Sequence, residues 1–334
     1  MADVCLKGVT KRFGSTVAVN AMSLEIPDGA FFVLLGPTGA GKTTTLRLIA
    51  GLEAPDAGEI MIAGRAVAGE TPAERNVTMV FQQYSLYPHL TVRENLAFPL
   101  RSPILRTPEE EIARKVGEVA EVLHIAHKLD NKATALSGGE MQRVSIGRAL
   151  VREPEIHLMD EPLSSLDAKL RADLRVELKR IQAGLGATML YVTHDQIEAM
   201  TMATRVGVLE EGRLVQVGSP REIYEDPVSL YVAGRLGLPR INALPADLFA
   251  GAPTGATTIG LRPEHIAQDR VGGEGKPSRV VRVEHLGDQT RLHLNLDGHD
   301  IVTLTDVHTE LEPGDTVAIQ PRNALFFDAS GARI

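Results

Sequence analysis

Short apolar runs that alternate with helical patterns organise the first two thirds of the chain. Residues 30–35, 156–159 and 187–192 are nearly continuous apolar runs, as expected of strands buried on both faces of a parallel sheet. A helical pattern follows each run, and the first of these patterns, at 42–50, ends before Gly51, a suitable C-cap. The alternation predicts an α/β domain with a mainly parallel sheet.

Residues 92–151 interrupt this alternation and are expected to form a helical insert. They contain no strand pattern, and their apolar residues recur at helical spacing, as at Ile112, Val116, Val119 and Leu123. Outside the insert, further strands are expected at 4–6, 22–26, 59–63 and 77–81, with a hairpin of 206–209 and 213–217 around Glu211 and Gly212.

After about Gly234 the pattern changes to short strands. Alternating residues such as Leu292 and Leu294 predict a half-buried strand. With similar segments at 280–283, 301–304, 316–319 and 324–327, they predict a small all-β barrel or sandwich, and 272–275 an exposed loop. We therefore expect two domains, 1–235 with a helical subdomain at about 88–155, and 236–334.

Composition and charge narrow the classes of protein. The chain has 334 residues, 43% of them apolar, and a formal net charge of −8. The acidic total argues against a nucleic-acid partner, which should meet a basic surface. Cys5 is the only cysteine, so no intrachain disulfide is possible. No apolar run approaches the roughly 18 residues of a membrane span, so any role at a membrane requires partners.

Residues 36–43, which we call the phosphate loop, read Gly-Pro-Thr-Gly-Ala-Gly-Lys-Thr. Their position between an apolar strand and a helix suits an anion, because glycines let backbone N–H groups converge at a helix N-terminus. Lys42 is expected to contact the β- and γ-phosphates, and Thr43 to supply a hydroxyl to Mg²⁺. The nucleotide contacts predicted here are Gly36, Thr38, Gly39, Ala40, Gly41, Lys42, Thr43 and Thr44.

Two acids end the apolar run at 156–159. Ligands gather at the carboxyl ends of parallel strands, so Asp160 and Glu161 can face the nucleotide bound by Lys42. One carboxylate suits Mg²⁺, and the next can polarise a water for in-line attack on the γ-phosphate.

A third motif, Leu-Ser-Gly-Gly-Glu at 136–140, is called the signature segment below. With it, the chain resembles the ATP-binding cassette (ABC) ATPases over 4–235. The resemblance implies a P-loop NTPase, RecA-like core that binds ATP and Mg²⁺. It further implies that Phe13 stacks on adenine, that Glu161, His194, Gln82 and Lys42 take part in catalysis, that Ser137, Gly138, Gly139 and Asp167 contact ATP, and that Thr43, Gln82 and Asp160 hold the metal.

Ser137 and Glu140 also have the spacing of a capping box at the start of a helix. In the resembled family this helix end meets the γ-phosphate held by another chain, which implies two copies, or a paralogous pair, arranged head to tail. Glu140 departs from the family pattern, where glutamine is commoner. An added negative charge near ATP could weaken closure, although the contacts come mainly from the serine and glycine positions.

The tail adds a second resemblance. Residues 261–265 (Leu-Arg-Pro-Glu-His) and the alternating strands after them look like the OB-like, TOBE-type regulatory domain of maltose-type importer ATPases. This implies a bacterial ATPase, peripheral at the cytoplasmic face of the inner membrane. Its expected partners are two permease subunits, indirectly a periplasmic or lipid-anchored solute-binding protein, and a possible regulator on the tail. Tyr84, Leu86, Tyr87 and Pro88 are candidates for a permease groove, or for local core packing.

Alternatives remain open at this point. The solute is expected to be a carbohydrate, a polyol or a glycerol phosphate, but polyamine, sulfate and iron importers carry related tails. A nucleic-acid-associated ABC protein is a more remote alternative, disfavoured by the acidic total and by the 4% aromatic content. A GTPase is weaker still, because no Asn-Lys-x-Asp guanine-reading motif occurs: Asn131 and Lys132 are followed by Ala133 and Thr134.

Overall fold

The computed structural model describes residues 2–103, 105–269 and 274–334. The chain divides into two compact units, Met1–Pro220 and Arg221–Ile334. In the second unit Arg262 donates hydrogen bonds to the carbonyls of Ala233 and Tyr224, at 3.0 and 2.9 Å. Tyr224 and Ala233, which the sequence assigned to the first domain, therefore hydrogen-bond to Arg262 of the second unit. The boundary at 235 stays a prediction.

A six-stranded sheet forms the centre of the first unit, as the alternating pattern predicts. Its order is β10-β9-β3-β8-β7-β6, and every neighbouring pair is parallel except β10 with β9. The strands β3, β7 and β8 are buried along their whole length, which explains their apolar sequences. The bounds are β3 (Phe31–Leu35), β6 (Val77–Val80), β7 (Ile156–Asp160), β8 (Met189–Thr193), β9 (Arg205–Glu210) and β10 (Arg213–Gly218).

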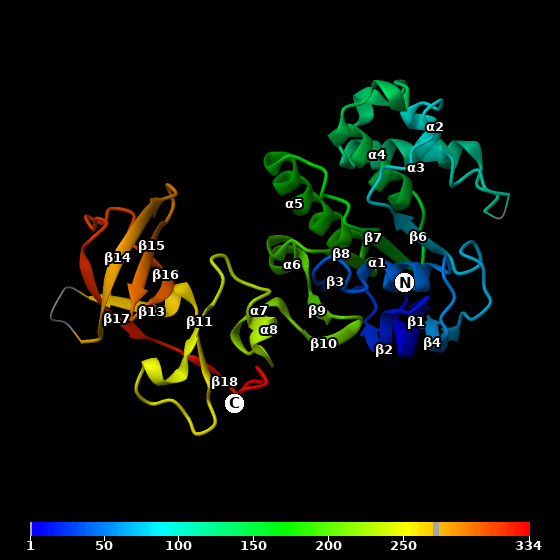
Figure 1. The fold of residues 1–334 in the computed structure, drawn as a ribbon. Coiled ribbons are helices and arrows are strands. Elements are labelled where there is room, and N and C mark those ends of the chain that lie inside the picture. The colour runs from blue at the N-terminus through cyan, green and yellow to red at the C-terminus, as the bar shows by residue number, and fades with distance from the viewer. Residues whose placement is uncertain (1, 104, 270–273) are drawn as a thin grey trace. The chain divides into compact units, whose positions relative to one another are not determined.

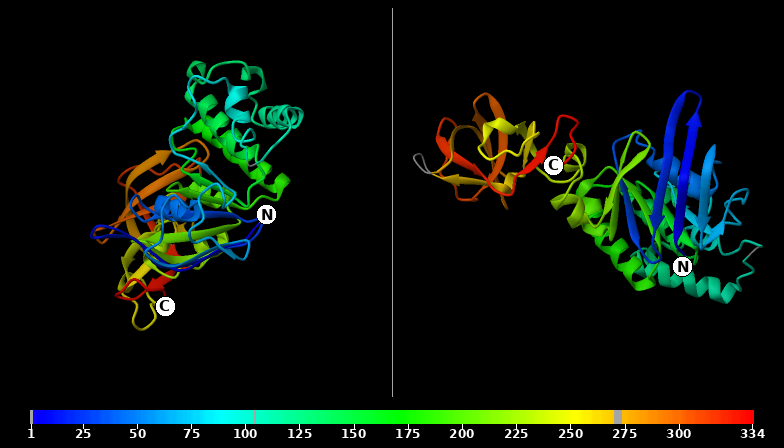
Figure 2. Two further views of the ribbon diagram at one scale, coloured as in Figure 1. Left: turned by 90° about the vertical axis from the view of Figure 1, so that its right-hand side faces the viewer. Right: turned by 90° about the horizontal axis from the view of Figure 1, so that it is seen from below.

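A second, antiparallel sheet has the order β2-β1-β4-β5. Its first two strands form the long blue hairpin of Figure 2, far longer than the strands expected at 4–6 and 22–26. The hydrophobic pattern did not predict the remaining residues of these two strands, because many of them, such as Lys7 and Lys11, are polar. Bulges also interrupt the register between the strands. The bounds are β1 (Val4–Phe13), β2 (Thr16–Ile26), β4 (Ala57–Ile62) and β5 (Arg65–Ala66).

Helix α1 (Lys42–Ala50) lies between these two sheets. Its buried Leu46, Leu48 and Ile49 join one apolar cluster with side chains of β1, β2, β3, β4, β7 and β8. Gly51 ends the helix in the left-handed conformation, as expected of a C-cap. Burial of this helix fixes the position of the phosphate loop, which directly precedes it.

The helical insert is confirmed and lies together in Figure 1 as α2 (Val92–Ala97), α3 (Glu109–Val122) and α4 (Gly138–Leu150). Buried Ile112, Val116 and Ala120 form the inner face of α3. Two short 3₁₀ turns, η1 (Ala126–Lys128) and η2 (Ala133–Ala135), connect α3 to α4. After the insert come α5 (Ala168–Leu185) and α6 (Gln196–Met202).

The second unit is mainly antiparallel β-structure around its own apolar core, as predicted. One sheet has the order β11-β12-β18 and the other β13-β17-β14-β15-β16. In β15, Leu292, Leu294 and Leu296 are buried at alternate positions. Gly272 and Gly273 of the expected loop lie outside the described residues. The bounds are α7 (Pro220–Glu225), α8 (Leu230–Ala233), β11 (Asn242–Pro245), η3 (Ala246–Leu248), β12 (Thr258–Leu261), η4 (Pro263–His265), β13 (Ile266–Asp269), β14 (Lys276–His285), β15 (Thr290–Leu296), β16 (His299–Thr305), β17 (Thr316–Pro321) and β18 (Leu325–Phe327).

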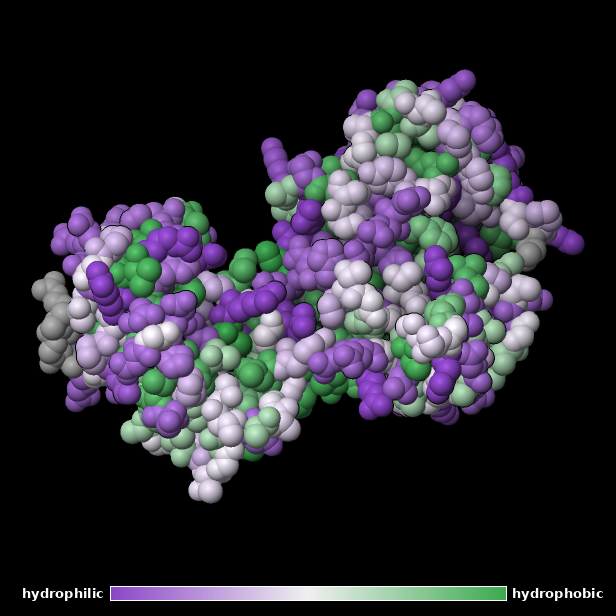
Figure 3. Space-filling view, in the orientation of Figure 1, coloured by the Kyte–Doolittle hydropathy of each residue, from purple (hydrophilic) through white to green (hydrophobic). Residues whose placement is uncertain are grey.

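Polar and apolar side chains intermingle on the surface of the molecule that faces the viewer in Figure 3. Within the described residues, no helix combines the length and the apolar character that a membrane crossing requires.

Candidate functional site

The phosphate loop leaves backbone donors available at the start of α1. Gly41 caps this helix without a side-chain hydrogen bond, so the N–H groups of its first turn have no side-chain partner there. Gly39 and Gly41 have φ of 83° and 95°. A Cβ on Gly41 would lie 2.3 Å from the carbonyl oxygen of Ala18, so only glycine fits. The loop is therefore built to present N–H groups to an anion.

Lys42 lies folded back over the loop that precedes it. Its Nζ donates to the carbonyl oxygens of Gly36 and Pro37, at 2.9 and 3.0 Å. It also lies 3.7 Å from Oε1 of Glu161. Burial lowers the pKa of Lys42, while the carboxylates of Glu161 and Asp160 oppose that shift. A phosphate that reached Lys42 would exchange carbonyl partners for a charged one.

Thr43 and Asp160 meet at the carboxyl end of β7. The hydroxyl of Thr43 donates to Oδ1 of Asp160 at 2.9 Å. Burial raises the pKa of Asp160, and the bond from Thr43 partly offsets this. The described residues hold no cluster of three or more histidine, cysteine or acidic side chains fit for a metal. One hydroxyl and one carboxylate nevertheless suit Mg²⁺, which takes few protein oxygens and completes its shell with phosphates and water.

Glu161 lies one residue further along and contacts two other predicted catalytic residues. Its Oε2 is 3.1 Å from Nδ1 of His194, and its Oε1 faces Lys42. The contact with His194 follows from the sheet, because Asp160 pairs with Val192 of β8 in parallel register. Glu161 has φ of 44°, a left-handed conformation that is uncommon for a residue with a side chain. Such conformations are found at functional sites, where the surrounding structure maintains them.

The turn that carries His194 is held by a buried carboxylate that sequence reasoning missed. Glu198 accepts hydrogen bonds from the hydroxyls of Tyr191 and Thr193, at 3.0 and 2.6 Å. Asp195 donates its backbone N–H to Thr193 and caps α6 through its side chain. Burial raises the pKa of Glu198. The sequence signal was that Asp195 and Glu198 have the spacing of residues that cap a helix. This spacing did not indicate that the Glu198 side chain would be buried.

Gln82 and Phe13 lie near this edge of the first unit without joining the cluster. Gln82 is exposed, two residues after β6, the strand that pairs with β7. Within the described ranges it forms no hydrogen bond or ion pair. Phe13 ends β1, is 46% exposed, and has Lys11 Nζ 5.2 Å from its ring centroid. The contact of Ala18 with Gly41 brings this hairpin to the phosphate loop. An exposed ring is suited to stack on a base.

The signature segment forms the N-terminus of α4. Ser137 and Glu140 form a complete capping box, as their spacing predicts. A Cβ on Gly139 would lie 2.2 Å from Cδ2 of Leu170, so a side chain at this helix end would displace the Leu170 side chain. Asp167 caps α5, the helix that carries Leu170, at 2.9 Å. A hollow of about 520 Å³ is lined by His124, His127, Ser137, Gly138, Gly139, Glu140, Arg143, Ser165, Leu166, Asp167 and Leu170.

These two clusters are not joined within one chain. Across the described ranges, no hydrogen bond or ion pair links residues 36–43 to residues 137–140. In Figure 1 the signature segment starts α4 in the helical insert, whereas α1 lies beside the central sheet. The structure thus gathers Lys42, Thr43, Asp160, Glu161 and His194, and leaves Ser137, Gly138 and Gly139 apart from them.

Comparison with known proteins decides the family. Residues 19–164 match the ABC transporter family, and residues 259–327 match the TOBE domain. The chain is 46% identical over 353 residues to an sn-glycerol-3-phosphate import ATP-binding protein of Rhizobium meliloti, covering 100% of both chains. It is 47% identical over 334 residues to a trehalose/maltose import ATP-binding protein of Thermococcus litoralis, covering 89% of each. The chain belongs to the ABC transporter ATP-binding family.

Solved ABC ATPases share the fold of the first unit. A dimeric, post-hydrolysis ATP-binding cassette bound to ADP and Pi is 32% identical, with a TM-score of 0.59 over 65% of this chain and 99% of that one. An ABC transporter component from Clostridium perfringens is 26% identical, with a TM-score of 0.62 over 67% and 90%. The predicted family and fold class are confirmed, and the roles of individual site residues stay predictions.

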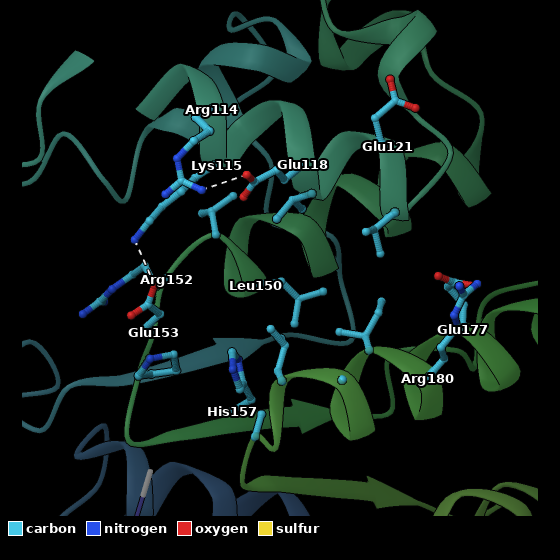
Figure 4. Close-up of a pocket in the computed structure, with 18 of the residues that line it drawn as sticks. Arg114, Lys115, Glu118, Glu121, Leu150, Arg152, Glu153, His157, Glu177 and Arg180 are labelled. Carbon is cyan, nitrogen blue, oxygen red and sulfur yellow. Dashed lines mark hydrogen bonds and ion pairs between the residues drawn. The ribbon is translucent and has the colours of Figure 1, made fainter. Parts of the chain in front are cut away.

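A cleft larger than the hollow at the signature segment lies elsewhere in this ABC ATPase. It has a volume of about 1000 Å³ and lies between α3, the end of α4 and α5 (Figure 4). Arg114 pairs with Glu118 and Lys115 with Glu153 at its rim. Buried His157 also lines it, and burial, with Arg152 nearby, lowers the pKa of His157 to about 4. No residue predicted to contact nucleotide lines this cleft, so its size does not mark the nucleotide site.

Proposed function

We propose that this chain is the ATP-hydrolysing subunit of a bacterial ABC importer, and that it works as a head-to-tail pair. The observation that carries the proposal is the contact of Glu161 with both Lys42 and His194, beside the Thr43–Asp160 pair. This cluster lies at the carboxyl ends of adjacent parallel strands, where ligands of such sheets bind.

Each residue of the cluster has a definite task in ATP hydrolysis. The N–H groups of the phosphate loop and Lys42 bind the phosphates. Thr43 and Asp160, with Gln82, hold Mg²⁺, which supplies charge neutralisation at the phosphates when bound. Glu161 orients the attacking water and accepts its proton, because its carboxylate is the one beyond the metal pair. His194 holds the Glu161 carboxylate in place and can donate to the γ-phosphate.

The second half of the site comes from the partner chain. Ser137, Gly138 and Gly139 form a helix N-terminus that suits a phosphate, and they do not contact their own phosphate loop. Two chains arranged head to tail bring each signature segment to the ATP on the other chain. Phe13 then stacks on adenine, and Asp167 lines the shared surface. Hydrolysis removes the γ-phosphate contacts and opens the pair.

The relatives and the Gln82 region support a proposal for the cargo and the membrane partners. We propose a carbohydrate, polyol or glycerol-phosphate solute, and two permease subunits at the cytoplasmic face of the membrane, fed by a solute-binding protein. Half-buried Tyr84, Leu86 and Tyr87, with exposed Pro88, are the proposed wall of the docking groove. Tyr87 packs on Phe98 with centroids 4.4 Å apart, and Phe98 is 50% exposed, which provides apolar surface there. The TOBE domain is the proposed position of a regulator.

The test is reconstitution of the chain with its permeases and solute-binding protein. We expect ATP hydrolysis that rises when glycerol 3-phosphate, maltose or trehalose is supplied. Stimulation by a polyamine, sulfate or iron instead would move the solute class and keep the ATPase assignment. Absence of both phosphate release and nucleotide-dependent pairing would overturn the proposal.

A further inference from the structure

Glu140 binds two different partners with its two carboxylate oxygens. Its Oε2 accepts from the backbone N–H of Ser137 at 2.8 Å and from the Ser137 hydroxyl at 2.9 Å. Its Oε1 lies 3.0 Å from Nζ of Lys128, which belongs to η1. Both side chains are about one quarter exposed, at 28% for Lys128 and 26% for Glu140. The backbone N–H of Ser137 and the ion pair with Lys128 keep the carboxylate ionised, with a pKa of about 2.

The carboxylate has two consequences for a phosphate that approaches Ser137. An ionised carboxylate only accepts hydrogen bonds, so the Ser137 hydroxyl directs its hydrogen to Glu140. A phosphate can take that hydrogen only when this bond opens. The carboxylate also places a negative charge in the first turn of α4, the same turn that carries the glycines of the signature segment, which disfavours a second anion there.

Lys128 counteracts both effects. Its ammonium group neutralises Glu140 and, by holding negative charge at Oε1, weakens the hydrogen bonds that Oε2 accepts from Ser137. Lys128 makes no other ion pair within the described part of the chain. His124, His127 and Arg143 also line the adjoining hollow, but none forms an ion pair with Glu140, and Arg143 donates to the carbonyl of Leu123 at 3.2 Å.

We propose that Lys128 is a positioning residue for nucleotide-driven closure. By pairing with Glu140, it lets the capping box of α4 release the Ser137 hydroxyl to the ATP on the partner chain. The ion pair Lys128–Glu140, neutral as a whole, thereby serves in place of the uncharged glutamine that is commoner at position 140 in the resembled family. The inference deepens the proposed function and rests on it, because closure across the signature segment is what Lys128 adjusts.

A double-mutant cycle tests this inference. The full-length chain carrying Glu161→Gln serves as the parent, so that ATP is retained, and the ATP concentration for half-maximal pairing is measured by light scattering. We expect Lys128→Met to raise that concentration about three- to tenfold, as for loss of a partly exposed charge pair facing an anion. Lys128→Arg should restore the parent value, because it keeps the charge.

The decisive arm adds Glu140→Gln. In that background the amide needs no counter-charge, so Lys128→Met should have no further effect on pairing. The effect of Lys128→Met should also shrink as salt rises from 0.1 to 1 M, because salt screens charge repulsion. A matched control is Lys115→Met on α3, which removes the ion pairs of Lys115 with Glu111 and with Glu153. It should leave pairing unchanged.

The outcomes distinguish failure of the role of Lys128 from failure of the proposed function. An equal effect of Lys128→Met with Glu140 and with Gln at position 140 would overturn the inference and leave the proposed function intact. No effect in either background, with unchanged thermal melting of the variants, would do the same. A parent chain that binds ATP but never pairs would overturn the proposed function, and the inference with it.

Discussion

The phosphate loop and the signature segment each lie at the N-terminus of a helix, but the two helices are capped differently. Helix α1 has no side-chain cap, whereas α4 carries a complete capping box. The phosphate loop is held by a buried helix between two sheets, and Ser137 is exposed at the edge of the helical insert. In the proposed pair, one half of the site is therefore open to an anion from the start, and the other must exchange an internal hydrogen bond for an external one.

This difference bears on the order of events. An uncapped helix end and a buried lysine can bind nucleotide in a single chain. An N-cap is worth roughly 0.5–2 kcal/mol, so α4 gives up its cap only when a phosphate compensates for it. We expect nucleotide to bind the phosphate loop first and the signature segment second. Pairing is then a consequence of binding.

The largest expected effect is on catalysis at the open half. Glu161→Gln should lower turnover about 10²–10⁴-fold while ATP binding and pairing persist, because it removes the proposed general base and leaves the phosphate contacts. Phosphate release and nucleotide titration measure the two quantities. Glu153→Gln, an exposed acid on the cleft rim, is the control and should turn over normally. Turnover near that of the unmodified chain in Glu161→Gln would refute the assignment.

The next effect tests whether the open half alone supplies affinity. Lys42→Ala should weaken ATP binding to the single chain by roughly 10–100-fold, the worth of a charge-assisted hydrogen bond in a buried site. Equilibrium binding of a fluorescent ATP analogue provides the measurement. Lys179→Ala is the control, since among the described residues its Nζ bonds the carbonyl of Thr201 and no carboxylate. Unchanged affinity in Lys42→Ala would contradict the role of the phosphate loop.

A smaller effect concerns the pH dependence of the free energy of unfolding, through His157 of β7, the strand that ends at Asp160. The folded chain holds His157 neutral with a pKa near 4, against an ordinary 6.5, so the unfolded chain binds protons more readily. Stability is therefore full above about pH 6.5 and falls as the pH drops towards 4, by about 2 kcal/mol at pH 5. In His157→Gln this part of the slope in urea unfolding should disappear. An unchanged slope would show that His157 is not held neutral.

The smallest effect compares two matched caps. Thr91 on α2 and Ser137 on α4 form the same capping box with Glu94 and Glu140. Thr91→Ala and Ser137→Ala should each lower the free energy of unfolding by about 1 kcal/mol. Only Ser137→Ala should also weaken ATP-dependent pairing. Equal pairing defects in both variants would mean that the signature segment acts only through stability.

The sequence predicted the parts of the site that are contiguous. Residues 36–43 and the pair Asp160 and Glu161 follow buried strands, so their chemistry could be placed at one sheet edge. His194 and Gln82 came from family resemblance, because a lone histidine or glutamine carries no such signal. The parallel register of β7 with β8 then explains why His194 meets Glu161.

Other features could not be predicted from the sequence, because they are contacts between residues that the folded chain brings together. Leu170 beneath Gly139, Lys128 beside Glu140, and Glu198 under the turn of His194 have ordinary local sequences. Their roles appear only when helices pack. The hairpin of β1 and β2 is longer than predicted for a different reason. Its polar residues break the hydrophobic pattern of a strand, while backbone pairing continues along it.

The most direct test of the central claim mixes two defective chains. Lys42→Ala disables the phosphate loop and Ser137→Arg disables the signature segment, so each variant alone should hydrolyse ATP poorly. If each site is shared between chains, a mixed pair contains one site with both defects and one intact site. We predict that mixing the two purified variants restores ATP hydrolysis well above either alone. If the mixture is no more active than its components, each site is built within one chain, and the account is contradicted.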